Sequence, residues 1–313
     1  MEHYVTLFDS LFLPQGVALH ASLLRHAQPF TLWVLCVDET TQDVLDRLQL
    51  ANIRTIGLAE IETEELLAVK GGRSRGEYCW TLTPFSPQLV FDREPSAMRV
   101  TYLDADTWFC RSPAEIFEDF DASGKAVLIT EHAYAPEYDQ TPQTGRFCVQ
   151  FMTFKRDEGE VVRRWWAERC IEWCFARIEN GRFGDQMYLD DWPVRFRDLV
   201  HVLRKPSLTQ APWNVTRFAP SEAAFFHFHG LRLLRNRSLL LADSYYPLPA
   251  TTRRMIYLPY LQDFRDAVQR LQAAGHAARV QIDRAVPLLR MDMALRSLRT
   301  WFYKARLLRH ASL

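Results

Sequence analysis

The sequence predicts an α/β protein with a mostly parallel central sheet flanked by helices. In the first 70 residues, short apolar runs alternate with stretches of about a dozen residues that have helical periodicity, the pattern of parallel strands joined by crossover helices. Residues 30–37 are almost all apolar, as in a strand that is buried on both faces. The chain has 313 residues, of which 48% are hydrophobic and 24% charged, so it can bury a large globular core.

The N-terminal elements follow in regular order. We expect strands at residues 4–8, 30–37 and 53–58, and helices at residues 14–26, 40–50 and 60–70. Residues 71–76 form a glycine-rich basic loop, which is either a solvated connector or a lid whose arginines contact phosphate groups. A helical stretch then begins at Tyr78 and is interrupted by Pro84 and Pro87.

The second half of the chain continues the alternation less regularly. We expect strands at residues 100–103, 125–130, 147–154, 200–203 and 224–228, helices at residues 113–120 and 157–179, and a helical stretch at residues 185–192. The helix at residues 157–179 is the longest of these. From residue 251 the pattern becomes helical and basic, so the sequence predicts a domain of residues 1–250 and a helical extension of residues 251–313.

Charge is unevenly distributed along the chain. Residues 251–313 contain 12 lysines and arginines against 4 acidic residues, a net charge of +8; because the whole chain is neutral, residues 1–250 carry −8. Residues 288–308 combine basic side chains with leucine, methionine and aromatic residues, which is typical of an amphipathic helix at an anionic membrane or of a helix docked on its own domain. The acidic body argues against nucleic acid as a partner.

The sequence shows no pattern of secretion or of membrane insertion. It enters a strand directly after its first three residues, without a signal peptide, and it has no run of about 18 apolar residues. The six cysteines form no C-x-x-C pair, and the spacing of Cys170 and Cys174 fits core packing. We therefore expect a cytoplasmic protein with reduced cysteines, either free or peripheral at the inner face of the membrane through its C-terminus.

Asp104 and Asp106 follow the apolar strand at residues 100–103 and are the main candidates for a functional site. Two carboxylates one residue apart repel each other, and no lysine or arginine lies beside them in the sequence to neutralise them. In an α/β sheet, ligands bind at the carboxyl ends of the strands. The pair therefore predicts a site for a divalent cation, and hard carboxylate oxygens suit Mg²⁺ or Mn²⁺ bound together with substrate phosphates.

Two further motifs carry polar groups. In the run H-F-H-G, His227 and His229 share a face if the strand continues, and Gly230 lets a ligand approach the backbone. An imidazole ligand would favour Mn²⁺ over Mg²⁺. In F-G-D-Q-M-Y-L-D-D-W, Asp185 either caps the helical stretch that begins there or, together with Gln186, recognises the hydroxyl groups of a sugar.

Four motifs, taken together, resemble a known family. T-L-F-D at residues 6–9, Y-L-D-A-D at residues 102–106, F-G-D-Q-M-Y-L-D-D-W at residues 183–192 and H-F-H-G at residues 227–230 occur in this order and spacing. Across residues 3–232 the chain resembles nucleotide-sugar glycosyltransferases of the GT-A fold, a Rossmann-like α/β fold, and specifically those related to glycosyltransferase family eight, of the glycogenin and lipopolysaccharide type.

The resemblance implies a role for each matching residue. It implies metal ligation by Asp104, Asp106 and His227, with Asp104 also near the ribose; contact with the nucleotide base by Thr6, Phe8 and Asp9; contact with the diphosphate by Gly230; and contact with the transferred sugar by Asp185 and Gln186. Two features depart from the family pattern. Cys148 and Gln150 replace an Asn and a Gly, and the Lys-Pro-Trp that follows the late motif is missing, so Arg232 or Arg235 is the candidate phosphate-binding cation.

The function that this resemblance implies is metal-dependent transfer of a hexose, with Mn²⁺ or Mg²⁺ as cofactor. The donor would be a nucleoside-diphosphate sugar, with UDP as the expected nucleotide, and the acceptor a glycan or a lipid-linked sugar, with retention of configuration, in the synthesis of surface polysaccharide or lipopolysaccharide. A non-catalytic membrane- or glycan-binding protein of the same fold is the alternative. A D-x-D phosphatase fits less well, because Trp108 stands where that motif has Thr or Val.

Overall fold

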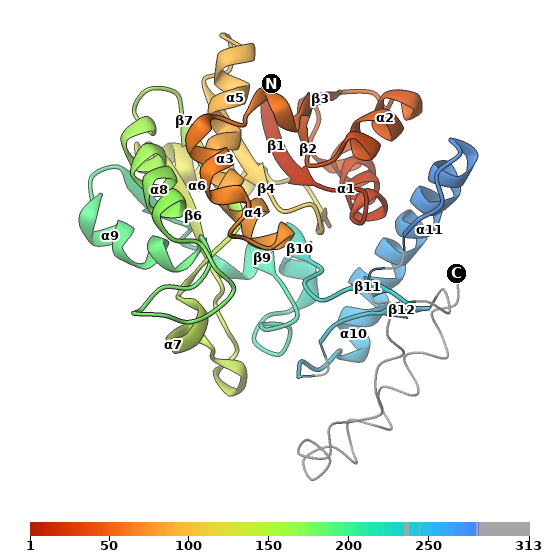
Figure 1. Ribbon diagram of the computed structural model, residues 1–313. Coiled ribbons are helices and arrows are strands. Elements are labelled where there is room, and N and C mark those ends of the chain that lie inside the picture. The colour runs from red at the N-terminus through yellow and green to blue at the C-terminus, as the bar shows by residue number, and fades with distance from the viewer. Residues whose placement is uncertain (235–237, 244, 280, 282–313) are drawn as a thin grey trace.

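The structure, a computed structural model, describes residues 1–234, 238–243, 245–279 and 281. The amphipathic helix expected at residues 288–308 and the candidate cation Arg235 lie outside these residues. Seven strands form the central sheet in the order β3-β2-β1-β4-β7-β6-β8 (Figure 1). They are β1 (Glu2–Phe8), β2 (Phe30–Cys36), β3 (Ile53–Gly57), β4 (Arg99–Leu103), β6 (Val127–Glu131), β7 (Phe147–Lys155) and β8 (Val200–Val202).

The central sheet is mostly parallel, as the sequence predicts. Only β7 runs against its neighbours, since it pairs antiparallel with both β4 and β6 while the remaining pairs are parallel. The other strands that the structure describes form two smaller sheets. One joins β5 (Thr107–Phe109), β10 (Phe225–His227) and β9 (Thr209–Gln210), and the other joins β11 (Arg232–Leu233) and β12 (Leu239–Leu240).

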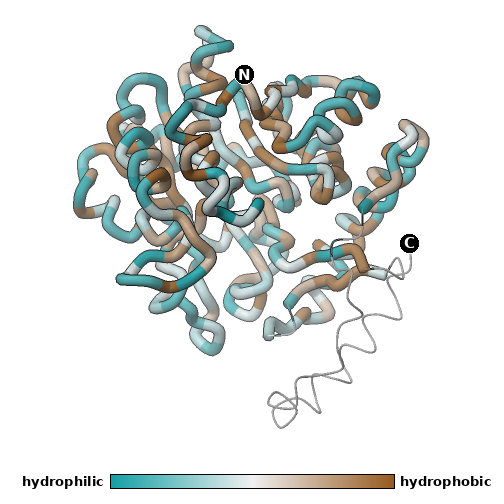
Figure 2. The backbone as a smooth tube through the Cα atoms, in the orientation of Figure 1, coloured by the Kyte–Doolittle hydropathy of each residue, from teal (hydrophilic) through white to brown (hydrophobic). Residues whose placement is uncertain are grey.

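Helices cover both faces of the central sheet, and each face has its own buried core. One face packs against α3 (Glu64–Lys70), α4 (Arg75–Leu82), α5 (Ser86–Arg93), α8 (Glu160–Glu172) and α9 (Trp192–Arg195). The other packs against α1 (Leu13–His26), α2 (Glu39–Leu48), α6 (Ala114–Ser123) and α11 (Leu258–Ala273). Hydrophobic residues gather along the strands, and hydrophilic residues lie on the outer turns of the peripheral helices (Figure 2).

Residues 250–273 pack against the rest of the fold rather than standing apart from it. They form α10 (Ala250–Thr252), a π-helical turn (Arg253–Tyr257) and α11. The ring of Tyr260 stacks on Phe228 at a centroid distance of 3.6 Å, and Tyr257, Tyr260 and Phe264 share one buried cluster with Trp108. None of the helices described in the structure has the length and apolar character to cross a bilayer.

Three expected helices differ from the structure. The helix predicted at residues 157–179 is α8, which starts after Asp157 adopts a positive φ of 59° and ends at Glu172, because Trp173 turns into an extended, buried conformation. The helix predicted at residues 60–70 is split into a 3₁₀ turn (Leu58–Glu60) and α3, which Thr63 caps. Residues 185–192 contain a 3₁₀ turn (Met187–Asp191) rather than an α-helix.

Candidate active site

Asp104 and Asp106 lie in a tight turn at the carboxyl end of β4. The turn is closed by Thr107, whose backbone N–H and hydroxyl both donate to the carbonyl of Asp104, at 3.1 and 2.8 Å. The hydroxyl of Tyr102 donates to Asp104 Oδ1 at 2.9 Å and so fixes that carboxylate. The next strand, β5, begins at Thr107, so both carboxylates are held between two short segments of sheet.

His227 reaches the two carboxylates through the pairing of β10 with β5. In this antiparallel pair His227 lies opposite Thr107, and the N–H of Phe228 donates to the carbonyl of Asp106 at 2.7 Å. As a result, His227 Nε2 lies 3.1 Å from Asp106 Oδ1 and 3.6 Å from Asp104 Oδ2.

The three side chains form a donor set that fits a divalent cation. One ligand atom from each of Asp104, Asp106 and His227 lies within 4.8 Å of the others. Two hard carboxylates and one imidazole could hold Mg²⁺ or a transition metal such as Mn²⁺, with space left for substrate oxygens. The structure therefore brings together the three residues that the sequence nominates as metal ligands.

The charges in this cluster are strongly coupled. Burial raises the pKa of Asp104, and the negative charge of Asp106 raises it further, although His227 opposes both effects. Burial also opposes ionisation of Asp106, but His227 and Arg232 outweigh it and hold its pKa below the usual range. Burial would lower the pKa of His227, but the two carboxylates raise it well above its ordinary value. A cation bound between these groups would favour ionised carboxylates and a neutral imidazole.

The cluster opens into a cavity of about 550 Å³, a size typical of small-ligand sites. Four groups of side chains line it. They include Phe8, Asp9, Phe12 and Arg75; the cluster residues Asp104, Asp106 and His227 with His229 and Arg232; Asp185 and Gln186; and the aromatic residues Trp80, Tyr134, Phe183, Trp213 and Tyr246.

Of the three residues expected at the nucleotide base, Phe8 and Asp9 line the cavity and Thr6 does not. Thr6 is fully buried within β1. The ring of Phe8 lies against Gly16 of α1, where an added Cβ would come within 2.4 Å of the ring. Asp9 Oδ2 accepts a hydrogen bond of 2.9 Å from Arg75.

Only one arginine of the basic loop at residues 71–76 faces the cavity. Arg75 begins α4 and lies 2.9 Å from the carboxylate of Asp9 and 3.5 Å from that of Asp38. Arg73 instead donates to the hydroxyl of Thr81 and, at 2.6 Å, to the carbonyl of Ile171. The loop is therefore a connector at Arg73 and part of the cavity wall at Arg75.

Asp185 and Gln186 both line the cavity, and Asp185 does not act as a helix cap. Its backbone carbonyl accepts a hydrogen bond of 2.8 Å from Trp166, which fixes its position. Burial and the negative charge of Asp104 raise the pKa of Asp185 well above the usual range. The amide of Gln186 donates to the carbonyl of Thr144 at 2.6 Å.

Gly230 does not line the cavity, whereas Arg232 does. Gly230 has a φ of +81°, and a Cβ added there would lie 3.1 Å from the backbone nitrogen of Asp243. This geometry alone requires a glycine. The guanidinium of Arg232 lies 5.4 Å from the ring centroid of Phe12. Its positive charge lowers the pKa of Asp106, so Arg232 acts on that carboxylate although no cation lies beside it in the sequence.

Several residues at the site were not identified from the sequence. Tyr102 could have been found, because residues two apart in a strand share a face and Asp104 follows at that spacing. Trp213 has no local signal; it reaches the site on the loop after β9 and packs edge-on against His227 and His229, with centroid distances of 5.5 and 5.7 Å. Tyr134 and Tyr246 come from two separate loops.

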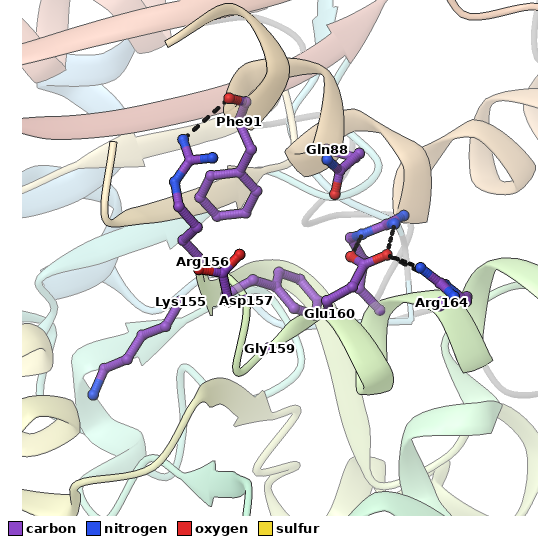
Figure 3. Close-up of a pocket in the computed structure, with 10 residues that line it drawn as sticks. Gln88, Phe91, Lys155, Arg156, Asp157, Gly159, Glu160 and Arg164 are labelled. Atoms are coloured by element: carbon purple, nitrogen blue, oxygen red, sulfur yellow. Dashed lines mark hydrogen bonds and ion pairs between the residues drawn. The ribbon is translucent and has the colours of Figure 1, made fainter. Parts of the chain in front are cut away.

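A second cavity of about 230 Å³ lies at the start of α8 and is shown in Figure 3. Three of the basic residues that line it, Arg156, Arg163 and Arg164, are already hydrogen-bonded within the fold. Arg156 donates to the carbonyl of Phe91, and Glu160 accepts from both Arg163 and Arg164 (Figure 3). Arg156 also donates to the carbonyls of Glu94 and Ala97. The cavity is thus bounded by structural ion pairs.

Comparison with known proteins places the chain in a family. No protein-family model matches it. It is 32% identical over 250 residues to the uncharacterized protein YfnF of Bacillus subtilis strain 168, and this alignment covers 74% of this chain and 82% of YfnF. It is 28% identical over 287 residues to the uncharacterized protein YfnD of the same organism, covering 87% of this chain and 91% of YfnD.

A solved structure shows the fold. The bifunctional glycosyltransferase WbbM superposes with a TM-score of 0.51 at 12% sequence identity, over 89% of this chain and 52% of WbbM. At this identity the likeness concerns the fold and not the substrates. The chain therefore belongs to the protein family of Bacillus subtilis YfnF, and it has the GT-A fold of glycosyltransferases.

Proposed function

We propose that the protein is a metal-dependent glycosyltransferase that moves a hexose from a nucleoside-diphosphate sugar to a glycan or lipid-linked acceptor. The observation that carries this proposal is the cluster of Asp104, Asp106 and His227 at the floor of a cavity large enough for a nucleotide sugar. The GT-A fold supports it, because the cluster lies at the carboxyl end of β4, where ligands bind in α/β sheets.

We propose that each part of the donor contacts a different group of cavity residues. A divalent cation held by Asp104, Asp106 and His227 would neutralise the charge that develops on the leaving diphosphate. We propose that Arg232 assists there as a fixed positive charge, and that Phe8, Asp9 and Arg75 hold the base and ribose. Mn²⁺ is the expected metal, because an imidazole is among the ligands. UDP is the nucleotide expected from the family resemblance.

Asp185 and Gln186 are the candidates for stabilising the sugar as positive charge develops on its anomeric carbon. Because its amide group is tied to Thr144, Gln186 can direct its carbonyl oxygen to the cavity. Asp185 lines the cavity together with Gln186, and we propose that it forms a hydrogen bond with a hydroxyl group of the sugar. Retention of configuration stays an expectation from the resemblance to glycosyltransferase family eight.

The acceptor is proposed to enter along the aromatic side of the cavity. Tyr246 lines it there, and its hydroxyl accepts a hydrogen bond from Gln140, which also lines the cavity. Tyr245, which is 57% exposed, packs edge-on against Tyr138 and Tyr246. Aromatic faces with polar rims suit sugar rings, which have apolar faces and hydroxyl edges. A role in surface-polysaccharide synthesis and membrane contact through residues 288–313 stay predictions from the sequence.

The test is release of UDP from a panel of UDP-sugars in the presence of Mn²⁺. We expect turnover of at least one sugar that chelator abolishes and that Asp106→Asn reduces by at least about 100-fold, the loss typical of removing an electrostatic stabiliser. Asp191→Asn is the matched control, because Asp191 pairs with Arg195 at the surface and should keep full activity.

Two results would count against the proposal. Turnover that persists in excess chelator would exclude the metal-dependent mechanism. Absence of turnover with every donor, together with retained binding of a glycan or of liposomes, would instead favour a non-catalytic binding protein of the same fold. Liposome binding compared with and without residues 288–313 tests the membrane contact separately.

A further inference from the structure

We propose that Gln150 is a positioning residue that holds His227 in the one tautomer able to ligate a cation. Gln150 is one of the positions at which the sequence departs from the family that it resembles, and the proposed transfer reaction leaves it without a role. The inference rests on the proposed metal site.

The fold brings Gln150 to His227 across two different sheets. Strand β7 carries Gln150 and is inserted antiparallel between β4 and β6 (Figure 1). The backbone carbonyl of Gln150 accepts a hydrogen bond of 3.2 Å from the N–H of Asp104, which ties this residue to the metal turn. The side chain, 1% exposed, places Oε1 2.9 Å from His227 Nδ1.

The ring of His227 thus has a different partner at each nitrogen. Nε2 is the atom that lies near both Asp104 and Asp106, at 3.6 and 3.1 Å. A nitrogen that binds a cation must present its lone pair, so the single proton of a neutral imidazole has to sit on Nδ1. That N–H needs an acceptor in a buried site, and the amide oxygen of Gln150 is placed to accept it.

Burying the amide of Gln150 at this position is energetically unfavourable. Its amide nitrogen has no hydrogen-bond partner among the residues that the structure describes, and a buried unpaired donor destabilises the fold. An apolar side chain of similar length, such as methionine, would avoid that cost. The presence of an amide here is explained by its oxygen atom, which accepts a hydrogen bond from His227 and so orients that ring.

The test is the affinity for Mn²⁺, measured on the full chain by the electron paramagnetic resonance signal of free Mn²⁺. Gln150→Met keeps the side-chain length but removes the acceptor, and we expect about 10- to 100-fold weaker binding, the usual effect of removing a group that orients a metal ligand. Gln150→Glu keeps an acceptor oxygen and should bind Mn²⁺ at least as tightly as the wild type.

Gln210→Met is the matched control. Gln210 is equally buried, lies on β9 beside the strand that carries His227, and donates to the carbonyls of Ser207 and Ala219 instead of contacting the histidine. The Gln210→Met variant shows how far a loosened core alone changes metal binding, and its Mn²⁺ affinity should stay within about threefold of the wild type. Gln150→Met with wild-type affinity, or Gln150→Glu weakened as much as Gln150→Met, would overturn the proposal.

A measurement on the wild-type protein covers the case in which Gln150→Met does not fold. With Mg²⁺ bound, the ¹⁵N spectrum of the histidines should show His227 with its proton on Nδ1, and a proton on Nε2 would contradict the assignment. The two levels of inference can be separated. Mn²⁺ binding that Asp106→Asn does not weaken would overturn the metal site and with it the role of Gln150, whereas binding that requires Asp106 but not Gln150 would overturn only the latter.

Discussion

The substitution Asp263→Ala should destabilise the protein by about 2–3 kcal/mol, because Asp263 joins α11 to the strand that follows the metal turn. Asp263 Oδ2 accepts a hydrogen bond of 2.6 Å from the indole of Trp108, which is 5% exposed, and the carboxylate also pairs with Arg25. Loss of the acceptor leaves the Trp108 N–H buried and unpaired, at a cost of about 1–3 kcal/mol.

The ion pair adds a smaller amount. The side chain of Arg25 is 43% exposed, so solvent screening limits its pairing with Asp263 to about 0.2–1 kcal/mol. Asp263→Asn keeps an oxygen acceptor for Trp108 and loses only the charge, so it should cost about 1 kcal/mol or less. The two substitutions therefore divide the contribution of Asp263 into its hydrogen bond and its ion pair.

The assay is urea unfolding followed by tryptophan fluorescence, with the free energy of unfolding extrapolated to water. Arg25→Met is the control, because it removes the cation and leaves the Trp108 hydrogen bond; it should match Asp263→Asn. A cost for Asp263→Ala below about 0.5 kcal/mol, or equal to that of Asp263→Asn, would refute the assignment of the buried indole as the main partner.

Three further predictions follow from local geometry. Asp38 caps α2 by accepting hydrogen bonds from Thr41, and these bonds lower the pKa of Asp38 although burial opposes its ionisation. Asp38→Ala should therefore lower the free energy of unfolding, measured with urea, by about 0.5–2 kcal/mol at pH 7. The loss should be smaller as the pH falls below about 4. Arg75→Ala should weaken calorimetric binding of UDP with Mn²⁺ by about 10- to 100-fold, since two carboxylates then face the nucleotide end without their cation. Gly230→Ala should lower the melting temperature more than Gly124→Ala, because both have positive φ but only Gly230 has a backbone atom against the added Cβ.

Each of these predictions has a result that contradicts it. The sign for Asp38 follows from its lowered pKa, since the folded state favours the charged form above the unfolded pKa and loses that advantage in acid. A cost of Asp38→Ala that grows on acidification would oppose this reasoning. Unchanged UDP affinity in Arg75→Ala would place the base and ribose elsewhere. Equal melting temperatures for the two glycine variants would exclude the steric contact at Gly230.

Much of the fold could be read from the sequence because the informative signals are local. The alternation of strands and helices before residue 70 predicts parallel pairing, and the structure has it in β1, β2 and β3. Asp104 and Asp106 could be identified because polar residues that end a buried strand stand out against it. His227 could be linked to them only through the resemblance to a family, since the pairing of β5 with β10 joins segments more than 100 residues apart.

The remaining features depend on tertiary contacts that leave no local pattern. Nothing in the sequence of β7 indicates that it runs antiparallel between β4 and β6, and this insertion is what brings Gln150 to His227. The early end of α8 has a similar cause. Trp173 and Cys174 continue a helical pattern, but both are buried in the core beyond the last turn, and packing there outweighs helix propensity.

The most direct test of the metal centre is anomalous diffraction from crystals grown with Mn²⁺ and UDP. We expect one strong Mn²⁺ peak between Asp104, Asp106 and His227, with ligand distances of about 2.0–2.3 Å and diphosphate oxygens completing the coordination. A Mn²⁺ peak elsewhere, or UDP bound in the cavity with no metal between these three side chains, would contradict it.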